Sequence, residues 1–263
     1  MKKLPISVFI ITKDEADRIA QSVSSVIGWV DEVIVIDSGS EDATVEVASK
    51  LGADVVFNEW KGYGPQKVYG EKLCKNKWLL NIDADEEITT DLCDEIISIF
   101  EKEKPAYNAY RMKIRVLSRF ADKPCLFAPE HNRVRLYHRD YAGFKDSTVH
   151  DSVVVNEGEN VGQLKNIVLH RSFRSYRHAI AKINRYSSMQ AEDMLARGRR
   201  PSNLRIVIEP FIGFIKGYFV KRHCFMGIDG FIEGVIYAFA RTLRLAKARE
   251  LWKESECKKG ENI

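Results

Sequence analysis

The chain of 263 residues lacks several features that mark common protein classes. It has only five cysteines, an odd number, and no two of them are spaced as Cys-x-x-Cys. This pattern argues against a disulfide framework and against a zinc site, and it fits a reducing compartment. We find no low-complexity tract and no internal repeat, and the 45% of hydrophobic residues is ordinary for a globular protein.

The N-terminus has no signal-peptide hydrophobic region followed by a small-residue cleavage site. An apolar run begins almost at once, at Leu4, and predicts a strand. We therefore expect the protein to stay in the cytoplasm.

Charge is unevenly distributed, although the formal net charge is only +4. Residues 1–162 carry 21 Lys and Arg against 28 Asp and Glu, whereas residues 163–263 carry 20 against 9. The first part is thus acidic and the second strongly basic. Such asymmetry suggests a basic segment that meets an anionic partner, either a membrane surface or nucleic acid.

Hydrophobic periodicity predicts an α/β domain followed by a helical region. In the first ninety residues strands alternate with helices, which predicts a parallel sheet covered on both faces, with right-handed crossovers. The expected strands are Leu4–Ile11, Glu32–Ile36, Asp54–Phe57 and Trp78–Ile82, and the expected helices are Glu15–Ile27, Asp42–Leu51 and Pro65–Cys74. Ser40 or Asp42 is a plausible N-cap of the second helix.

After a helix near Asp91–Lys102 the links shorten, so we expect the sheet to end in mixed or antiparallel strands. These strands are Tyr107–Leu117, Arg133–Arg139, Ser147–Val155 and Val161–Leu169. Three helices follow, at Ser175–Arg197, Leu204–Arg222 and Gly227–Glu250. We expect a catalytic domain at 1–172 and a basic, amphipathic helical region at 173–263.

Two carboxylates, Asp83 and Asp85, stand one residue apart after the strand that ends at Ile82. At a strand end both can lean toward the same crevice and share a hard divalent cation such as Mg²⁺ or Mn²⁺. The alternative is a solvated acidic turn.

Two further polar clusters follow predicted strands, and ligands in such folds lie at the carboxyl ends of the strands. Asp37 can accept a hydrogen bond from a base or a ribose, and Gly39 gives the freedom for a tight turn. The alternative is an Asx-turn that only caps the next helix. Thr12, Asp14 and Glu15 could likewise hold a ribose, or Asp14 could cap the first helix.

Three motifs in order resemble those of glycosyltransferase family 2. They are Thr12-Lys-Asp-Glu15, then Asp37-Ser-Gly-Ser40 with Asp42 and Thr44, then Leu79-Leu-Asn-Ile-Asp-Ala-Asp-Glu86. The resemblance covers roughly residues 4 to 170, the nucleotide-sugar domain with the GT-A fold. It is strongest to the branch of bacterial lipopolysaccharide-core glycosyltransferases, whose later Val-His-Glu motif reads Val149-His150-Asp151 here.

The resemblance implies an inverting transferase that uses a nucleoside-diphosphate sugar, with uridine as the expected nucleoside. Its nucleotide-sugar site would be formed by Thr12, Asp14, Glu15, Asp37, Ser38, Gly39, Asp83 and Ala84. Asp83 and Asp85 would hold Mg²⁺ or Mn²⁺ on the pyrophosphate. Asp151 is the predicted base that takes the acceptor proton, with Asp146 as its rival and a plain surface carboxylate as the alternative.

Several other side chains remain open between a role in the site and a structural one. His150 and His170 could complete the metal sphere or be structural. Gln66 and Lys67 match a family loop near the sugar, although Val68 stands where that loop has Asn. Arg133 and Arg135 could bind anionic acceptor groups or form salt bridges at the surface.

The basic, aromatic-rich C-terminal helices fit a peripheral contact with an anionic membrane, or else packing on the catalytic domain. The expected partners are therefore a sugar-nucleotide donor, a glycolipid or saccharide acceptor such as lipopolysaccharide core, and the cytoplasmic face of the inner membrane. One alternative is a sugar-nucleotide pyrophosphorylase, but the Gly-rich loop usual after its first strand is missing here. The other is a nucleic-acid-binding protein, but we find no such motif and expect no nucleic acid.

Overall fold

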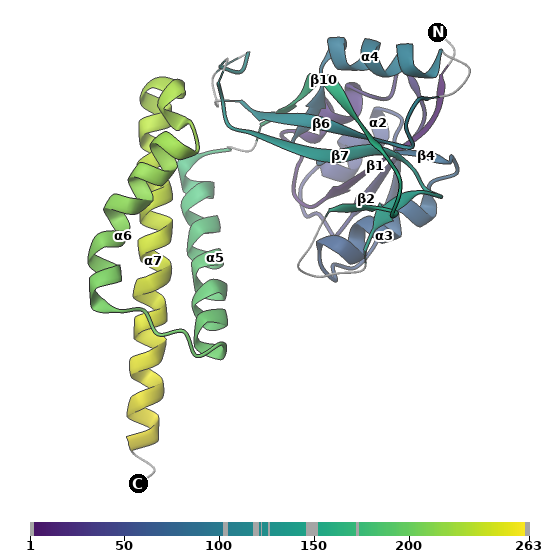
Figure 1. Ribbon diagram of the computed structural model, residues 1–263. Coiled ribbons are helices and arrows are strands. Elements are labelled where there is room, and N and C mark those ends of the chain that lie inside the picture. Colours follow the sequence, from purple (N-terminus) through teal and green to yellow (C-terminus); the bar gives the residue numbers. More distant parts are fainter. Residues whose placement is uncertain are drawn as a thin grey trace. The chain divides into compact units, whose positions relative to one another are not determined.

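The chain forms two compact units in a computed structural model (Figure 1). The structure describes residues 3–101, 105–117, 121, 123–125, 127–145, 152–171 and 174–260. The first unit comprises Met1–Val116 with Glu130–Ser172, and the second comprises Leu117–Pro129 with Phe173–Ile263.

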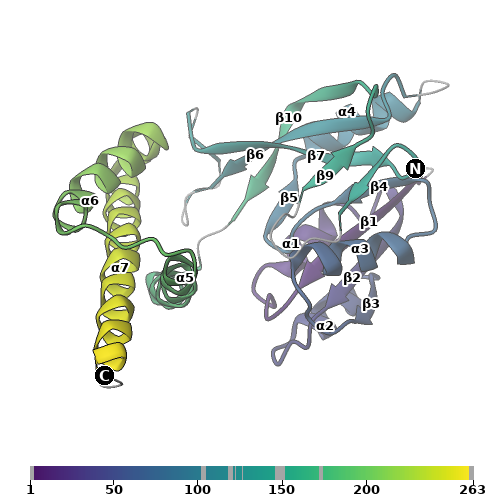
Figure 2. The same cartoon turned by 60° about the horizontal axis from the view of Figure 1, so that its bottom comes forward.

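The first unit is built on one mixed sheet of eight strands in the order β3-β2-β1-β4-β7-β6-β10-β5 (Figures 1 and 2). The strands are β1 Leu4–Thr12, β2 Val30–Asp37, β3 Asp54–Phe57, β4 Trp78–Asn81, β5 Glu86–Ile88, β6 Ala109–Val116, β7 Glu130–His138 and β10 Val161–His170. The first four are parallel, β7 runs antiparallel to β4 and β6, and β10 runs parallel to β6. A separate antiparallel pair is formed by β8 Ala142–Phe144 and β9 Val153–Val155.

Helices cover both faces of this sheet. Successive side chains of β1 point to opposite faces, so they are buried in two different apolar clusters. Its Val8 and Ile10 belong to one cluster, with buried side chains of α1 Ile19–Ser24, α2 Thr44–Lys50 and α4 Thr90–Phe100. Its Phe9 belongs to the other, against α3 Tyr63–Leu73 and the β8–β9 pair. The two-sided α/β class and the mixed end of the sheet are confirmed.

The second unit is helical, as expected. It contains α5 Tyr176–Ala196, α6 Asn203–Ile215, a π-helical turn η1 Lys216–Val220, a 3-10 turn η2 His223–Met226 and α7 Gly227–Gly260. The side chains of Ser175 and Ser202 cap α5 and α6 by accepting backbone N–H groups of the first turn. Among the described helices, none combines the length and the apolar character needed to cross a membrane.

Some element boundaries differ from the sequence expectations. The first helix is only six residues long, because turns on both sides continue its apolar spacing without regular helix. The N-cap of α2 is Ala43, so neither Ser40 nor Asp42 occupies that position, although Asp42 Oδ1 accepts the Thr44 N–H. Strands β5 and β8 were not predicted, since three residues carry too little periodicity.

Candidate active site

The predicted polar clusters lie at one edge of the sheet. Thr12 ends β1, Asp37 ends β2, and Asp83 and Asp85 follow β4. Because β1 lies between β2 and β4, the three carboxyl ends are neighbours. The first two turns are joined directly, since the Ser38 N–H donates to the Thr12 carbonyl at 3.0 Å.

The carboxylate of Asp37 holds its own turn. Its Oδ2 accepts the backbone N–H groups of Gly39 at 2.8 Å and Ser40 at 2.9 Å, and Gly39 adopts a φ of +88°. The side chain is buried and forms an Asx-turn that does not supply the N-cap of α2. The Ser40 hydroxyl also donates to Oδ1, which leaves the carboxylate about one lone-pair site that a nucleoside could use.

The turn after β1 is tied to the turn after β2. Asp14 has a φ of +53° and donates its N–H to Ser40 Oγ at 2.8 Å, and the Glu15 N–H donates to Thr44 Oγ1 at 2.7 Å. The buried Thr12 Oγ1 has no hydrogen-bond partner within the described residues. A buried hydroxyl without a partner is costly, so Thr12 is suited to receive a ligand group.

Consecutive residues at the start of α3 link the nucleoside turns to the acidic pair. The side chain of Gln66 is fully buried and donates to Ser38 Oγ at 3.0 Å, while it accepts from Asn58 Nδ2 at 2.7 Å. The next residue, Lys67, is also buried and places Nζ 3.1 Å from Asp83 Oδ1. Gln66 therefore positions the turns, and Lys67 brings a positive charge to the acidic pair.

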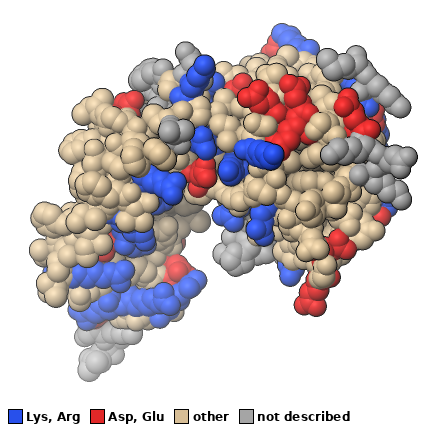
Figure 3. All heavy atoms as spheres, turned by 45° about the horizontal axis from the view of Figure 1, so that its top comes forward, with Lys and Arg blue, Asp and Glu red and all other residues tan. Residues whose placement is uncertain are grey.

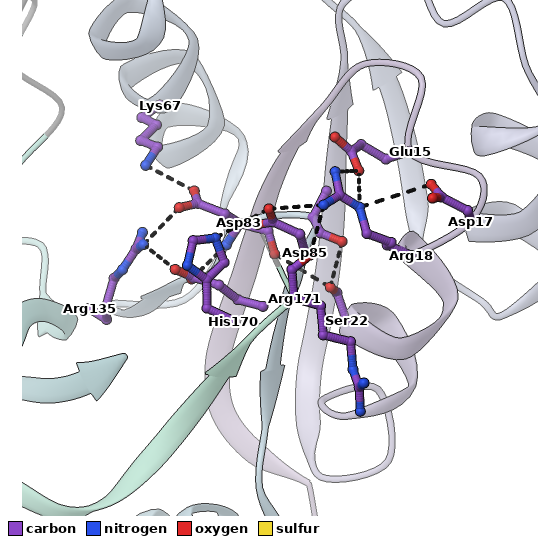
Figure 4. A network of polar contacts seen from close by, with 12 residues as sticks. Glu15, Asp17, Arg18, Ser22, Lys67, Asp83, Asp85, Arg135, His170 and Arg171 are labelled. Atoms are coloured by element: carbon purple, nitrogen blue, oxygen red, sulfur yellow. Dashed lines mark hydrogen bonds and ion pairs between the residues drawn. The ribbon is translucent and has the colours of Figure 1, made fainter. Parts of the chain in front are cut away.

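A buried arginine contacts the other oxygen of Asp83 (Figure 4). Arg135 Nη2 lies 2.8 Å from Asp83 Oδ2 and 2.7 Å from Glu86 Oε1, and Nη1 donates to Asn81 Oδ1 at 2.6 Å. Burial would raise the pKa of Asp83, but the charges of Arg135 and Lys67 hold it well below its usual range. Asp83 is therefore ionised at neutral pH.

Glu86 holds the backbone of the turn that carries Asp83. Its Oε2 accepts the Asp83 N–H at 2.9 Å, and its side chain is only 2% exposed. Burial raises the pKa of Glu86 against the opposing charge of Arg135, and Asp83 adds to the increase. The buried carboxyl group of Glu86 and the buried guanidinium of Arg135 thus hold the turn together.

Asp85 faces a different set of partners. Its Oδ2 lies 3.2 Å from His170 Nε2 and 3.3 Å from Arg18 Nη1, and Arg18 also donates to the Arg171 carbonyl at 2.9 Å (Figure 4). Burial opposes ionisation of Asp85, but the hydrogen bond and charge of His170 and the charge of Arg18 lower its pKa overall. Burial likewise opposes charge on His170, yet Asp85 raises its pKa.

The acidic pair suits a divalent cation only in part. No group of three or more His, Cys, Asp or Glu side chains in the described part of the chain is arranged to hold a metal. Asp83 and Asp85 supply carboxylate oxygens, which such a cation prefers as ligands, and substrate phosphates commonly supply others. These two carboxylates suit a cation that displaces Arg18 and the His170 hydrogen bond from Asp85.

Arg18 was not predicted to lie in the site, and Glu86 had no predicted role. No local signal indicates their contacts in the site, because Arg18 is 67 residues from Asp85 and Glu86 is 49 residues from Arg135. Arg135 was expected to meet an acceptor or to form a surface salt bridge, but it is 7% exposed and pairs inside the site. Arg133 is exposed on the same strand. Asp146, His150 and Asp151 lie outside the described residues.

Comparison with known proteins gives a consistent result. Residues 7–158 match the family described as Glycosyl transferase family 2. An uncharacterized glycosyltransferase of Rickettsia bellii is 46% identical, with 94% of this chain and 86% of that protein covered. The lipopolysaccharide core biosynthesis glycosyltransferase LpsC of Rhizobium meliloti is 30% identical, with 95% and 94% covered. The crystal structure of S. aureus TarS 1-349 in complex with UDP-GlcNAc is 12% identical with a TM-score of 0.46, covering 96% of this chain and 92% of that one.

Proposed function

The chain belongs to glycosyltransferase family 2 and is a glycosyltransferase, and we propose that it is an inverting, metal-dependent one. The proposed donor is a nucleoside-diphosphate sugar, with uridine as the nucleoside. The proposed acceptor is a glycolipid or saccharide such as lipopolysaccharide core, because the relative LpsC is named for that pathway. The mixed sheet agrees with the expected GT-A fold, and family membership decides against a pyrophosphorylase.

One observation carries the proposal: two consecutive residues of α3 join the two halves of a donor site. Gln66 contacts the turn after β2, and Lys67 contacts Asp83 after β4. A nucleoside bound at the turn after β2 would therefore place its pyrophosphate toward Lys67 and the acidic pair of Asp83 and Asp85. The unpartnered hydroxyl of Thr12 lies on the nucleoside side and supports this direction.

The proposed chemistry is a single displacement at the anomeric carbon. The acceptor oxygen forms a bond to this carbon, and the bond from the carbon to the diphosphate oxygen breaks. The electron pair leaves with the nucleoside diphosphate, where Lys67 can balance its charge. Asp151 is proposed to take the proton of the acceptor hydroxyl.

Mg²⁺ or Mn²⁺ would be held by Asp83 and Asp85, with His170 as a further ligand. A carboxylate has about four lone-pair sites, so the contacts of Asp83 with Lys67 and Arg135 leave sites for a cation. When bound, the cation would draw negative charge from the diphosphate leaving group. His150 is the alternative imidazole ligand.

Peripheral contact with an anionic membrane is part of the proposal, at the cytoplasmic face of the inner membrane. A glycolipid acceptor would lie in that membrane, and the basic charge of residues 163–263 favours anionic lipid.

The test is a panel of UDP, GDP and ADP sugars with Mg²⁺ or Mn²⁺, read by thermal shift and by release of the nucleoside diphosphate. We expect a uridine donor to raise the melting temperature only together with the cation. If none of these donors stabilises the protein, the proposed reaction is wrong.

A variant pair separates the base from the donor site. Asp151→Asn should bind donor with unchanged thermal shift but lose transfer to the acceptor. The matched control Asp54→Asn, which changes an exposed carboxylate on β3, should keep both activities. Transfer that survives in Asp151→Asn would remove Asp151 from the mechanism.

A further inference from the structure

Helix α6 exposes most of its large apolar side chains and buries a charged residue and a glycine. Helices of globular units normally bury their apolar stripe. Here the buried residues are Glu209 and Gly213, whereas the large apolar side chains point outward. Phe211 is 70% exposed, and Leu204, Val207 and Ile215 are all more than half exposed.

The exposed stripe continues beyond α6. We call the following exposed side chains the α6–α7 apolar face: Leu204, Val207, Ile208, Phe211, Ile212, Ile215, Phe219, Val220, Phe225, Ile228, Phe231, Val235 and Phe239. In α7 they recur every three or four residues, so they share one side of that helix. Ring contacts of Phe214 with Phe231 at 5.5 Å and of Tyr218 with Phe231 at 6.1 Å join the two helices.

The rotation of α6 is fixed by its contacts with α7. Glu209 forms an ion pair with Arg241, which takes its carboxylate away from solvent. A Cβ at Gly213 would stand 2.9 Å from the Cα of Ala238, so only glycine permits this approach. Turning α6 to hide its apolar stripe would break the ion pair and remove the glycine from the contact. The exposure of the stripe is therefore built into the packing.

The charge beside the face is positive. Arg205, Lys216, Lys221 and Arg222 are exposed, and the one acidic residue between 203 and 226 is the buried Glu209. On the adjoining part of α7, Asp229 and Glu233 are half-buried. Figure 3 shows Lys and Arg side chains in patches among uncharged residues of the helical unit.

We propose that the α6–α7 apolar face docks on a bilayer that contains anionic phospholipid. Thirteen large exposed apolar side chains exceed the small patches that monomeric proteins usually tolerate. Aromatic and aliphatic groups flanked by Lys and Arg are the composition of helices that lie in a membrane interface. A symmetric pairing of two copies would instead bring the same Lys and Arg side chains against each other. The inference deepens the proposed membrane contact and rests on it, but not on the identity of the sugar donor.

The test uses the full chain and flotation with vesicles of phosphatidylcholine alone or mixed equally with phosphatidylglycerol. We expect binding to the mixed vesicles, weakened by salt. Replacing Phe211 or Phe219 by Ser should weaken binding on the order of tenfold each. Replacing Lys216 or Lys221 by Gln should weaken it about fivefold each, on the mixed vesicles only.

Matched controls change the same chemistry outside the face. Met189→Ser removes a 58% exposed apolar side chain of α5, and Lys253→Gln removes an exposed charge near the end of α7. Both should bind vesicles nearly as well as the unchanged protein. All variants should keep the thermal shift with the sugar donor, which separates a failure of docking from a failure of the proposed reaction.

Three results would overturn the proposal. One is that the unchanged protein does not float with either vesicle. Another is that Phe211→Ser and Phe219→Ser bind as well as the controls. The third is that these substitutions convert a dimer to a monomer in light scattering without changing vesicle binding, which would make the face a contact between two copies.

Discussion

Replacing Arg135 by Met should destabilise the first unit by about 3–5 kcal/mol, because it removes the positively charged partner of a buried ion pair and leaves the acidic partner behind. Arg135 is 7% exposed and contacts Asp83, Glu86 and Asn81. Met replaces the unbranched stem of Arg and lacks the guanidinium, so the main loss is charge and hydrogen bonding. Glu86, only 2% exposed, is then left as a buried acid without its counter-ion.

The fluorescence of tryptophan during urea unfolding measures this effect. Trp29, Trp60 and Trp78 belong to the first unit and Trp252 to the second, so the series is made in a Trp252→Phe background. With a slope of about 2 kcal/mol/M, the midpoint should fall by about 1.5–2.5 M urea. Arg133→Met is the matched control, since Arg133 is exposed on the same strand, and it should stay within about 0.5 kcal/mol.

A second substitution measures the interaction energy between Arg135 and Glu86. Glu86→Gln removes the negative charge that Glu86 carries above its raised pKa of about 7, and it keeps an oxygen that can accept from Arg135. In the double variant Asp83 still has Lys67, so no buried charge is unpaired. The double variant should therefore be less destabilised than the sum of the two singles, by about 1–3 kcal/mol. Strict additivity, or an Arg133→Met loss equal to that of Arg135→Met, would refute this account of the site.

Three more measurements follow from the contacts. Asp85→Asn should remove the Mn²⁺-dependent part of the donor thermal shift while circular dichroism stays unchanged; a full shift would exclude Asp85 as a ligand. Burial raises the pKa of Glu71 above the ordinary 4.5 despite its hydrogen bonds. The folded chain then binds more protons than the unfolded chain between these two pKa values, so the free energy of unfolding should fall as pH rises through that window. Glu71→Gln should flatten this slope in urea titrations at several pH values, and an unchanged slope would contradict the assignment. Gly213→Ala should cost the helical unit about 1–3 kcal/mol, because its Cβ would stand 2.9 Å from the Cα of Ala238. The Cβ of Gly28→Ala would meet nothing within 4 Å, so this variant should be nearly neutral. Differential scanning calorimetry measures both variants, and equal losses of stability would contradict the close-packing argument.

Several parts of the fold followed from the sequence. The range Asp54–Phe57 was predicted to the residue, and the strands on either side of it were found within two residues. Long runs of β-branched residues and regular helical spacing make these elements locally determined. The first helix was overestimated, because turns share its apolar spacing, and β5 was missed, because its strand character comes from pairing with β10.

The candidate site divides in the same way. Thr12, Asp37, Asp83 and Asp85 could be singled out because each ends or follows a strand, and strand ends of a parallel sheet meet at one edge. Arg18, 67 residues before Asp85, could not be found in this way. Nothing near it in the sequence indicates that its guanidinium contacts that carboxylate.

By itself the sequence determined the α/β class, the helical second half, the family motifs and the order in which they follow the strands. These depend on local periodicity and on residue types, which can be read without knowing distant neighbours. The tertiary structure alone decided which charges neutralise Asp83 and Asp85, because ion pairs form through space between residues far apart in the chain. It also decided that α6 turns its apolar stripe outward, since the rotation of a helix is set by the groups it packs against.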